Sequence, residues 1–287
     1  MQAHEVLTNL CYPPACLLCH APLPACAAPD MLTVGAAGRP ATGSAHPAPP
    51  VERDEVLCDA CRGDMRQSRP PCCRRCGLSL DGAYDASPVC AGCRARPPAF
   101  DRAQSPWQYA GAVPGAIRAF KYRGRWRIGA WLASRMAASV PAGAIDLVVP
   151  VPLHWMKRLL RGADSSADLA RRVARALDAP CAPQALRRTR WTATQTALSP
   201  AGRRSNVRGA FAARSRFVAG RSVLLIDDVL TTGATADACA EALKAAGAAR
   251  VVVLTAARTP LSGAWGVGRG ARDFPAPCPL PPAPNSP

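Results

Sequence analysis

Continuous apolar runs that alternate with helical segments dominate the second half of the sequence and limit the folds it can adopt. Three such runs, at 145–153, 221–229 and 250–258, are separated by segments of helical periodicity at 166–180 and 234–248. Uninterrupted apolar runs of this length are typical of strands buried on both faces of a parallel sheet, which helices connect by right-handed crossovers. We therefore expect an α/β fold with a Rossmann-like parallel sheet over residues 99–259.

Two adjacent aspartates, Asp227 and Asp228, end the run "VLLIDDV", and the loop "TTGAT" (231–235) leads from them into the next helical segment. The carboxyl ends of parallel strands are where open α/β folds bind ligands. Backbone amides, threonine hydroxyls and the helix dipole can converge there on a phosphate, and Gly233 permits close approach of the backbone. Ribose hydroxyls would donate to two carboxylates, whereas helix capping explains only one of them. The pattern predicts a site for a phosphorylated sugar.

The first 98 residues contain eleven of the fourteen cysteines. Eight of these form four Cys-x-x-Cys pairs in series: Cys16/Cys19, Cys58/Cys61, Cys73/Cys76 and Cys90/Cys93. Two such pairs complete a tetrahedral site of four thiolates around Zn²⁺. A redox dithiol could explain one pair but not four in a row. Chain order predicts two structural zinc ions, one held by the first two pairs and one by the last two, with metal binding supplying most of the local folding free energy.

Composition divides the chain into three regions. Residues 1–98 would form a double zinc ribbon with a flexible, Gly- and Pro-rich insertion at about 29–55. Residues 99–259 would form the α/β domain, and residues 260–287 have the Pro-rich composition of a disordered tail.

The formal net charge of +17 predicts attraction to polyanions. Nine arginines and no acidic residue lie between Arg187 and Arg221, with Trp191 among them, and "AFKYRGRWRIGAW" interleaves Phe120, Tyr122, Trp126 and Trp131 with basic residues. Arginines beside stacking aromatics are what single-stranded DNA binding requires. Core packing of the aromatics, and a diphosphate role for the arginines, remain open as alternatives.

No apolar run is long enough to span a bilayer, and "MQAHEVLTNLCYPPAC" lacks the basic start and apolar core of a signal peptide. Closely paired cysteines favour metal binding in a reducing compartment. We expect a cytoplasmic protein without a membrane span.

The motif "VLLIDDVLTTGAT" resembles the PRPP-binding signature of type I phosphoribosyltransferases. The chain from Cys16 to Arg258, apart from 29–55, is similar to the ComF (GntX-like) family. The stretches that carry this similarity are "CLLC", "CCRRCGLSL", "RPPAFDRA", "AFKYRGR", "DLVVPVPLHWMKRLLRG" and "TQTALSPAGRRSNVRGAF", in the same order.

The resemblance implies a double zinc ribbon followed by a type I phosphoribosyltransferase domain that binds PRPP with Mg²⁺. It implies that Asp227 and Asp228 hold the ribose, with Mg²⁺ bridging ribose and diphosphate oxygens. The 5-phosphate would be bound by Thr231, Thr232, Gly233, Ala234 and Thr235. It also implies a diphosphate loop after "VPVPLH" and a mobile hood over 187–211.

One departure from the family pattern concerns the segment after the diphosphate strand, where members usually have RGFNQ. Here Ala163, Asp164 and Ser165 replace the aromatic residue and the two amides, which removes donors and adds a negative charge near a phosphate. Two functions stay open. One is a PRPP-binding adaptor that acts in DNA uptake during natural transformation, with single-stranded DNA and competence-machinery proteins as partners. The other is a phosphoribosyltransferase active on an unidentified acceptor, with no DNA role. No residue stands out as a general base, and the departure favours the adaptor.

Overall fold

The computed structural model describes residues 15–23, 56–80, 88–122, 126–141, 143–153, 164–190 and 206–260. Packing divides these residues into two compact units, one ending at Arg62 and the other beginning at Gly63. The predicted insertion at 29–55 lies outside the described residues, as does the predicted tail after Pro260. The boundary between these packing units lies after Arg62, whereas composition predicted domain boundaries at residues 98 and 259. The predicted boundaries remain predictions.

The described part of the first unit is a small cysteine-bearing knuckle. The chain turns at 17–19, and Leu17 N–H donates to the carbonyl of Val56 at 2.9 Å. The short helix α2 (Asp59–Gly63) begins directly after Cys58 and contains Cys61. The knuckle as a whole has few buried apolar residues, chiefly Leu23, Val56 and Leu57. A core of this size cannot supply much folding free energy, in agreement with a segment that depends on metal.

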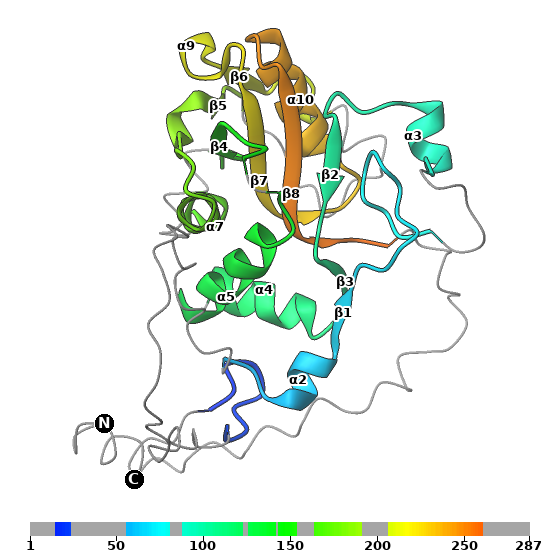
Figure 1. Ribbon diagram of the computed structural model, residues 1–287, viewed down its shortest axis with the longest axis vertical. Helices are drawn as coiled ribbons and strands as arrows, with labels where there is room; N and C mark the ends of the chain where they lie inside the picture. Colours follow the sequence, from blue (N-terminus) through cyan, green and yellow to red (C-terminus); the bar gives the residue numbers. More distant parts are fainter. Residues whose placement is uncertain are drawn as a thin grey trace, which may run out of the picture. The chain divides into compact units, whose positions relative to one another are not determined.

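The second unit is built on a six-stranded sheet whose hydrogen-bonded order is β1-β3-β8-β7-β4, with β2 also paired to β8 (Figure 1). Its strands are β1 (Met65–Gln67), β2 (Arg102–Gln104), β3 (Trp107–Gly111), β4 (Leu147–Pro150), β7 (Ser222–Leu230) and β8 (Arg250–Arg258). Every pairing is parallel except β1 with β3. The prediction of an α/β fold with a mainly parallel sheet is confirmed, and the three predicted strands, β8, β7 and β4, are neighbours in it.

Strand register determines where the acidic pair lies. Strand β7 pairs with β8 from Ser222↔Arg250 to Leu230↔Arg258, and with β4 up to Pro150↔Ile226. Strand β4 therefore ends one residue before the level of Asp227. The end of β4 and the acidic pair of β7 meet at the carboxyl edge of the sheet, where ligands bind in this class of fold.

Helices cover both faces of the sheet. The longer ones are α4 (Val113–Tyr122), α5 (Trp126–Ala137), α7 (Ser165–Ala176) and α10 (Ala234–Ala245). The chain passes from β4 through α7 to Cys181, which pairs with Val148 on the outer side of β4, whereas α10 connects β7 to β8 in the opposite direction. Right-handed crossovers in opposite directions place α7 and α10 on opposite faces. None of the helices among the described residues has the length and apolarity needed to cross a membrane.

The predicted hood segment begins and ends in a small antiparallel ribbon. Strand β5 (Leu186–Arg188), which follows the 3-10 turn η1 (Pro183–Ala185), pairs with β6 (Phe211–Ala213) from Leu186↔Ala213 to Arg188↔Phe211. The ribbon contacts α10, and the short helix α9 (Ser215–Val218) leads from it to β7. Residues 191–205 of this segment lie outside the described residues.

The second group of cysteines belongs to the core of the sheet unit. Cys73, Cys76, Cys90 and Cys93 are buried in one apolar cluster with side chains of the sheet and of α10, among them Leu225, Val253 and Leu243. Cys90 is the N-cap of the short helix α3 (Ala91–Ala95). This cysteine group therefore packs as part of the α/β unit.

Candidate functional site

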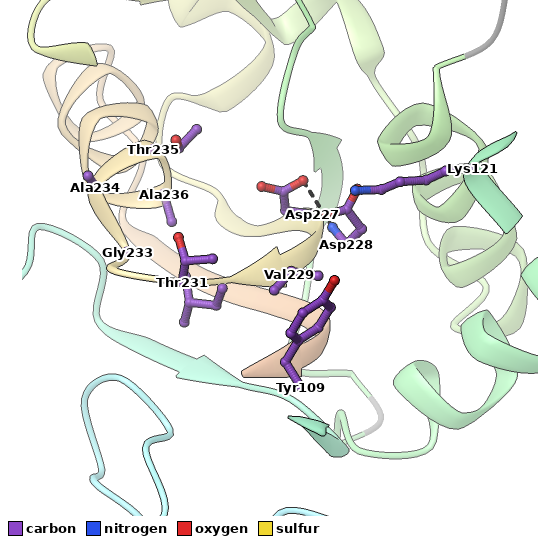
Figure 2. A pocket seen from close by; sticks show the side chains of 11 residues that line it. Tyr109, Lys121, Asp227, Asp228, Val229, Thr231, Gly233, Ala234, Thr235 and Ala236 are labelled. Carbon is purple, nitrogen blue, oxygen red and sulfur yellow. Dashed lines mark hydrogen bonds and ion pairs between the residues drawn. The ribbon is translucent and has the colours of Figure 1, made fainter. Parts of the chain in front are cut away.

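The acidic pair and the threonine loop line one cavity of about 330 Å³ at the carboxyl end of β7 (Figure 2). Its lining residues are Tyr109, Lys121, Asp227, Asp228, Val229, Leu230, Thr231, Gly233, Ala234, Thr235 and Ala236. Six of the seven residues predicted to bind a sugar phosphate are among them. The seventh, Thr232, is exposed and instead accepts a hydrogen bond through its hydroxyl from Ala234 N–H at 3.4 Å.

Asp227 is a part-buried carboxylate with two internal donors. Its Oδ1 accepts from Ser166 Oγ at 3.0 Å and from the backbone N–H of Asp228 at 2.9 Å. Burial, followed by the charge of Asp228, raises the pKa of Asp227 to about 7, against the opposing effect of these donors and of Lys121. Near neutral pH this group therefore changes between an acid and a hydrogen-bond-accepting carboxylate.

Asp228 forms an ion pair with Lys121 of helix α4. Their Nζ and Oδ2 atoms are 2.5 Å apart, and the side chains are 22% and 14% exposed. Figure 2 shows this pair at one side of the cavity, with the hydroxyls of Thr231 and Thr235 at the other. The cation offsets part of the repulsion between the acidic pair and an incoming anion.

The loop after β7 presents the start of a helix to the cavity. Gly233 has a φ of +81°, in the left-handed region that glycine adopts without strain, and serves as N-cap of α10 without a side-chain cap. The start of this twelve-residue helix, with the positive end of its dipole, therefore faces the cavity. Such a terminus, flanked by threonine hydroxyls, suits a phosphate group.

Sequence reasoning did not single out three residues of this site: Tyr109, Lys121 and Ser166. A signal existed for Lys121, which lies in the family stretch "AFKYRGR" and is one of only three lysines in the chain. Tyr109 in β3 and Ser166 in α7 had no such signal, because their place depends on which strands and helices become neighbours.

The departure at 163–165 has a local structural explanation in the part that is described. Asp164 is the N-cap of α7, where its Oδ1 accepts from Ala167 N–H at 3.1 Å, and Ser165 is the first residue of the helix. Aspartate is among the best N-cap residues because its side chain satisfies an otherwise unpaired amide. Ala163 lies outside the described residues.

A second cavity, of about 730 Å³, lies beyond the end of β4. Four arginines line it, namely Arg171, Arg187, Arg188 and Arg214, together with Asp164, Asp168 and the apolar Pro150, Pro152 and Leu153. The guanidinium of Arg188 also lies over the ring of Phe211 at 5.4 Å from its centroid. The excess of cations makes this cavity suitable for an anion.

The aromatic residues of "AFKYRGRWRIGAW" have different environments. Phe120 is buried, and Trp131 stacks on Trp107 with ring centroids 5.0 Å apart. Trp126, at the start of α5, is 63% exposed. Core packing thus accounts for Phe120 and Trp131 but not for Trp126. The side chain of Tyr122 and the whole of Trp191 lie outside the described residues.

The eight paired cysteines form the two predicted groups, Cys16, Cys19, Cys58 and Cys61, and Cys73, Cys76, Cys90 and Cys93. Within each group the sulfurs all lie within 4.8 Å of one another. The Sγ atoms of Cys19 and Cys58 are 3.6 Å apart, and those of Cys76 and Cys90 are 3.7 Å apart. Four sulfurs bonded to one zinc ion lie about 3.8 Å from each other. Both groups could therefore hold zinc, whereas Cys72, whose Sγ donates to the carbonyl of Arg69, is in neither.

Electrostatics within each group also favours a cation. In the second group burial opposes ionisation of Cys73, but amides of Cys76, Cys90 and Arg75 outweigh it and lower the pKa of this thiol to about 7. Burial and the neighbouring thiols raise the pKa of Cys93. Backbone amides and burial have the same opposed effects in the first group, where the pKa of Cys16 is lowered and that of Cys61 raised. Four thiolates cannot accumulate together without a divalent ion to offset their charge.

Comparisons with known proteins agree with this geometry. The family model "Phosphoribosyl transferase domain" matches residues 163–262, which include the whole acidic motif. "DNA utilization protein YhgH" of Salmonella typhi is 32% identical over 212 residues, covering 71% of this chain and 90% of the relative. "Competence protein F" of Haemophilus influenzae is 28% identical over 211 residues, covering 70% and 90%. A solved structure of glutamine phosphoribosylpyrophosphate amidotransferase from B. subtilis, complexed with ADP and GMP, overlaps 48% of this chain and 30% of that chain at 25% identity. Its TM-score is 0.34.

Proposed function

The chain belongs to the family of competence protein F and DNA utilization protein YhgH and carries a phosphoribosyl transferase domain; from this premise we propose that it binds PRPP with Mg²⁺ and acts in DNA uptake. The observation that carries the proposal is the composition of the 330 Å³ cavity. Two adjacent carboxylates, a threonine loop and the start of helix α10 face one space, which is what a phosphorylated sugar requires and a simple anion does not.

Each part of the ligand has a complementary group. Asp227 and Asp228 would accept hydrogen bonds from the ribose hydroxyls, since ionised carboxylates are acceptors only. The amides at the start of α10, with the hydroxyls of Thr231 and Thr235, would donate to the 5-phosphate. Tyr109 lies across the cavity from this loop in Figure 2, and would cover the sugar.

The diphosphate would extend toward the end of β4. This edge adjoins Asp227, because Val151 N–H donates to the carbonyl of Ile226 at 2.8 Å. The arginines of the second cavity lie on that side and would attract the diphosphate. Mg²⁺ bound with the ligand would be held beside Asp227 and Asp228 and would neutralise part of the charge of the diphosphate. Among the described residues of the cavity, the acidic pair would serve the ribose and Lys121 is paired with Asp228, so none is assigned to proton transfer.

The DNA part of the proposal is supported by the names of the relatives and by surface chemistry. Arg187, Arg208, Arg214, Arg216 and Arg221 are exposed on or near the β5–β6 ribbon. Trp126 adds an exposed aromatic surface on which a base could stack. Phosphodiester backbones are attracted by such a distribution of positive charge.

Titration calorimetry with PRPP and Mg²⁺ tests the sugar-phosphate site. Wild type should bind, and Asp227→Asn and Asp228→Asn should each weaken binding by about ten-fold or more, because each removes a charge-assisted acceptor worth ~1.5–3 kcal/mol. Ribose 5-phosphate should bind less tightly and lose affinity in the same two variants.

Asp178→Asn is the matched control, because Asp178 is exposed after the end of α7 with a φ of +50° that asparagine also adopts. This variant should bind PRPP as wild type does. Absence of heat with wild type would refute the proposal, and equal affinity in all four proteins would show that the acidic pair does not contact the ligand.

A further inference from the structure

Arg258, the last residue of β8, connects two parts of the α/β unit. It is 7% exposed, and its Nη1 donates to the carbonyls of Leu230 and Thr259 at 3.0 and 2.9 Å and also to that of Thr231. Its Nε donates to the carbonyl of Cys76 at 3.3 Å. One side chain thus holds both the start of the threonine loop and a turn of the second cysteine group.

The guanidinium of Arg258 is buried, and its acidic partners can be sought only within the described part of the chain. Among the residues that the structure describes, no carboxylate lies within ion-pair distance of its guanidinium. Burying a cation is costly unless dipoles or an opposite charge compensate for it. Carbonyl oxygens supply the dipoles here, and a nearby opposite charge would stabilise the guanidinium further.

The second cysteine group can supply that charge. A zinc ion with four thiolates carries a net charge of about −2. Because the group of Cys73, Cys76, Cys90 and Cys93 lies in the same core cluster as Leu230, metal loading would place this negative charge beside Arg258. The metal-loaded group and the buried guanidinium would stabilise each other.

A separate contact joins the same two regions. The chain leaving the second cysteine group passes Ala99, whose N–H donates to Asp237 Oδ1 in the first turn of α10 at 2.6 Å. The next residue, Phe100, is 2% exposed, and its ring lies 4.0 Å from where a Cβ on Gly233 would be. Both contacts place the cysteine side of the unit directly against the loop.

We propose that Arg258 is a positioning residue that couples metal loading of the Cys73–Cys93 group to the order of the loop from Leu230 to Thr235. The guanidinium holds the loop carbonyls only while the cysteine turn presents the Cys76 carbonyl and the charge of its metal centre. Loss of that metal would loosen the loop and lower its affinity for a sugar phosphate, a consequence that rests on the proposed function. The coupling between metal loading and the order of the loop does not depend on the proposed function.

Hydrogen exchange of the zinc-loaded, ligand-free full chain tests this coupling. The reporters are the amides of Thr259 and Asp237, which donate to the carbonyls of Leu230 and Gly233. In Arg258→Lys, which keeps a charge but cannot span both sets of carbonyls, these amides should exchange about ten-fold faster than in wild type. Cys93→Ser, which removes one ligand of the second group, should have the same effect.

Two variants serve as matched controls. Arg250→Lys changes an exposed arginine at the other end of β8, and Cys61→Ser removes a ligand of the first group, which lies in the other compact unit. Both should leave the reporters as in wild type. Elemental analysis should find about two zinc ions in wild type and Arg258→Lys, and about one in either cysteine variant. Because Arg258→Lys retains its metal, faster exchange in it reflects the guanidinium rather than misfolding.

The outcomes separate the coupling from ligand binding. Unchanged exchange at both reporters in Arg258→Lys and Cys93→Ser would overturn the coupling, whether or not the protein binds PRPP. Faster exchange in these two variants alone would support it, even if wild type gave no heat with PRPP. Where PRPP does bind, Arg258→Lys and Cys93→Ser should bind it about ten-fold more weakly than wild type. The two control variants should bind it as wild type does.

Discussion

At the scale of single residues, the site combines groups whose charges oppose each other. Burial, together with repulsion from Asp228, raises the pKa of Asp227 to about 7, while Lys121 forms an ion pair with Asp228 at 2.5 Å. In the acidic pair, Asp228 is thus already paired with a cation, whereas the ionisation of Asp227 depends on pH and on the ligand. A ribose hydroxyl needs the ionised form of Asp227 as its acceptor.

Affinity for PRPP with Mg²⁺ should therefore rise between about pH 6 and pH 8, as Asp227 loses its proton through a pKa of about 7. Calorimetry across this range measures the effect. Ligand phosphates also titrate, so the informative quantity is the ratio of wild-type affinity to that of Asp227→Asn. This ratio should grow with pH, and a constant ratio would contradict the assignment.

The same pKa has a consequence for stability in the absence of ligand. The pKa of Asp227 is raised in the folded protein above its unfolded value of about 3.9. The folded state therefore binds more protons between these values, and the contribution of this residue to stability falls as pH rises from about 4 to about 7. Denaturant unfolding should show this slope in wild type and lose it in Asp227→Asn.

At the scale of secondary-structure elements, α7 links the departure from the family pattern to the site. Its cap, Asp164, faces the arginine-lined cavity, while Ser166, two residues later, donates to Asp227. A single helix start thus determines the position of a hydroxyl that donates to Asp227 of one cavity and of a negative charge that lines the other.

Asp164→Ala should destabilise the protein by about 1 kcal/mol, since the N-cap hydrogen bond to Ala167 is lost. Asp164→Asn should retain stability, because asparagine caps equally well. It should also tighten PRPP binding, because it removes a negative charge from the cavity and restores the amide usual in the family. Denaturant midpoints and calorimetry measure the two effects. Equal stability of the alanine variant would argue against the cap.

At the scale of the whole molecule, a net charge of +17 coexists with a site built on two carboxylates. The positive charge is spread over exposed arginines, whereas the acidic pair is recessed beside Lys121. Under the proposed function, small anions would be drawn to the carboxyl edge, while a long polyanion would follow the surface. This division of charge is compatible with one protein that binds both a sugar phosphate and DNA.

Single-stranded DNA should bind with an affinity that falls steeply with salt, as expected when arginines displace condensed counterions. Trp126→Ala should weaken binding by about ten-fold, since stacking of one base is worth ~1–3 kcal/mol, and Trp126→Phe should retain most of it. Fluorescence anisotropy with a labelled oligonucleotide at several salt concentrations measures both. A flat salt response would exclude a phosphate-backbone interaction, and full affinity in Trp126→Ala would exclude stacking at this residue.

Local patterns in the sequence were sufficient for the central strands, their helices and the cysteine groups. The predicted strand at 250–258 corresponds to β8 over the same residues, and the predicted helix at 234–248 to α10. Each of these strands, helices and cysteine groups was predicted from hydrophobic periodicity, from glycine or proline at its ends, or from metal-ligand spacing. All three signals involve residues that are close together in the chain. The placing of Asp227 and Asp228 at the carboxyl edge follows from the same information.

Only the tertiary structure determined which residues meet across the molecule. Lys121, Ser166 and Arg258 lie 107, 61 and 27 positions from the nearest of the acid or loop residues they contact, namely Asp228, Asp227 and Thr231. The short strands β1, β2 and β3 likewise depend on β8 or on one another for pairing. The physical reason is that strand order and helix packing bring these distant residues together. A local sequence pattern carries no information about which distant residues will be in contact.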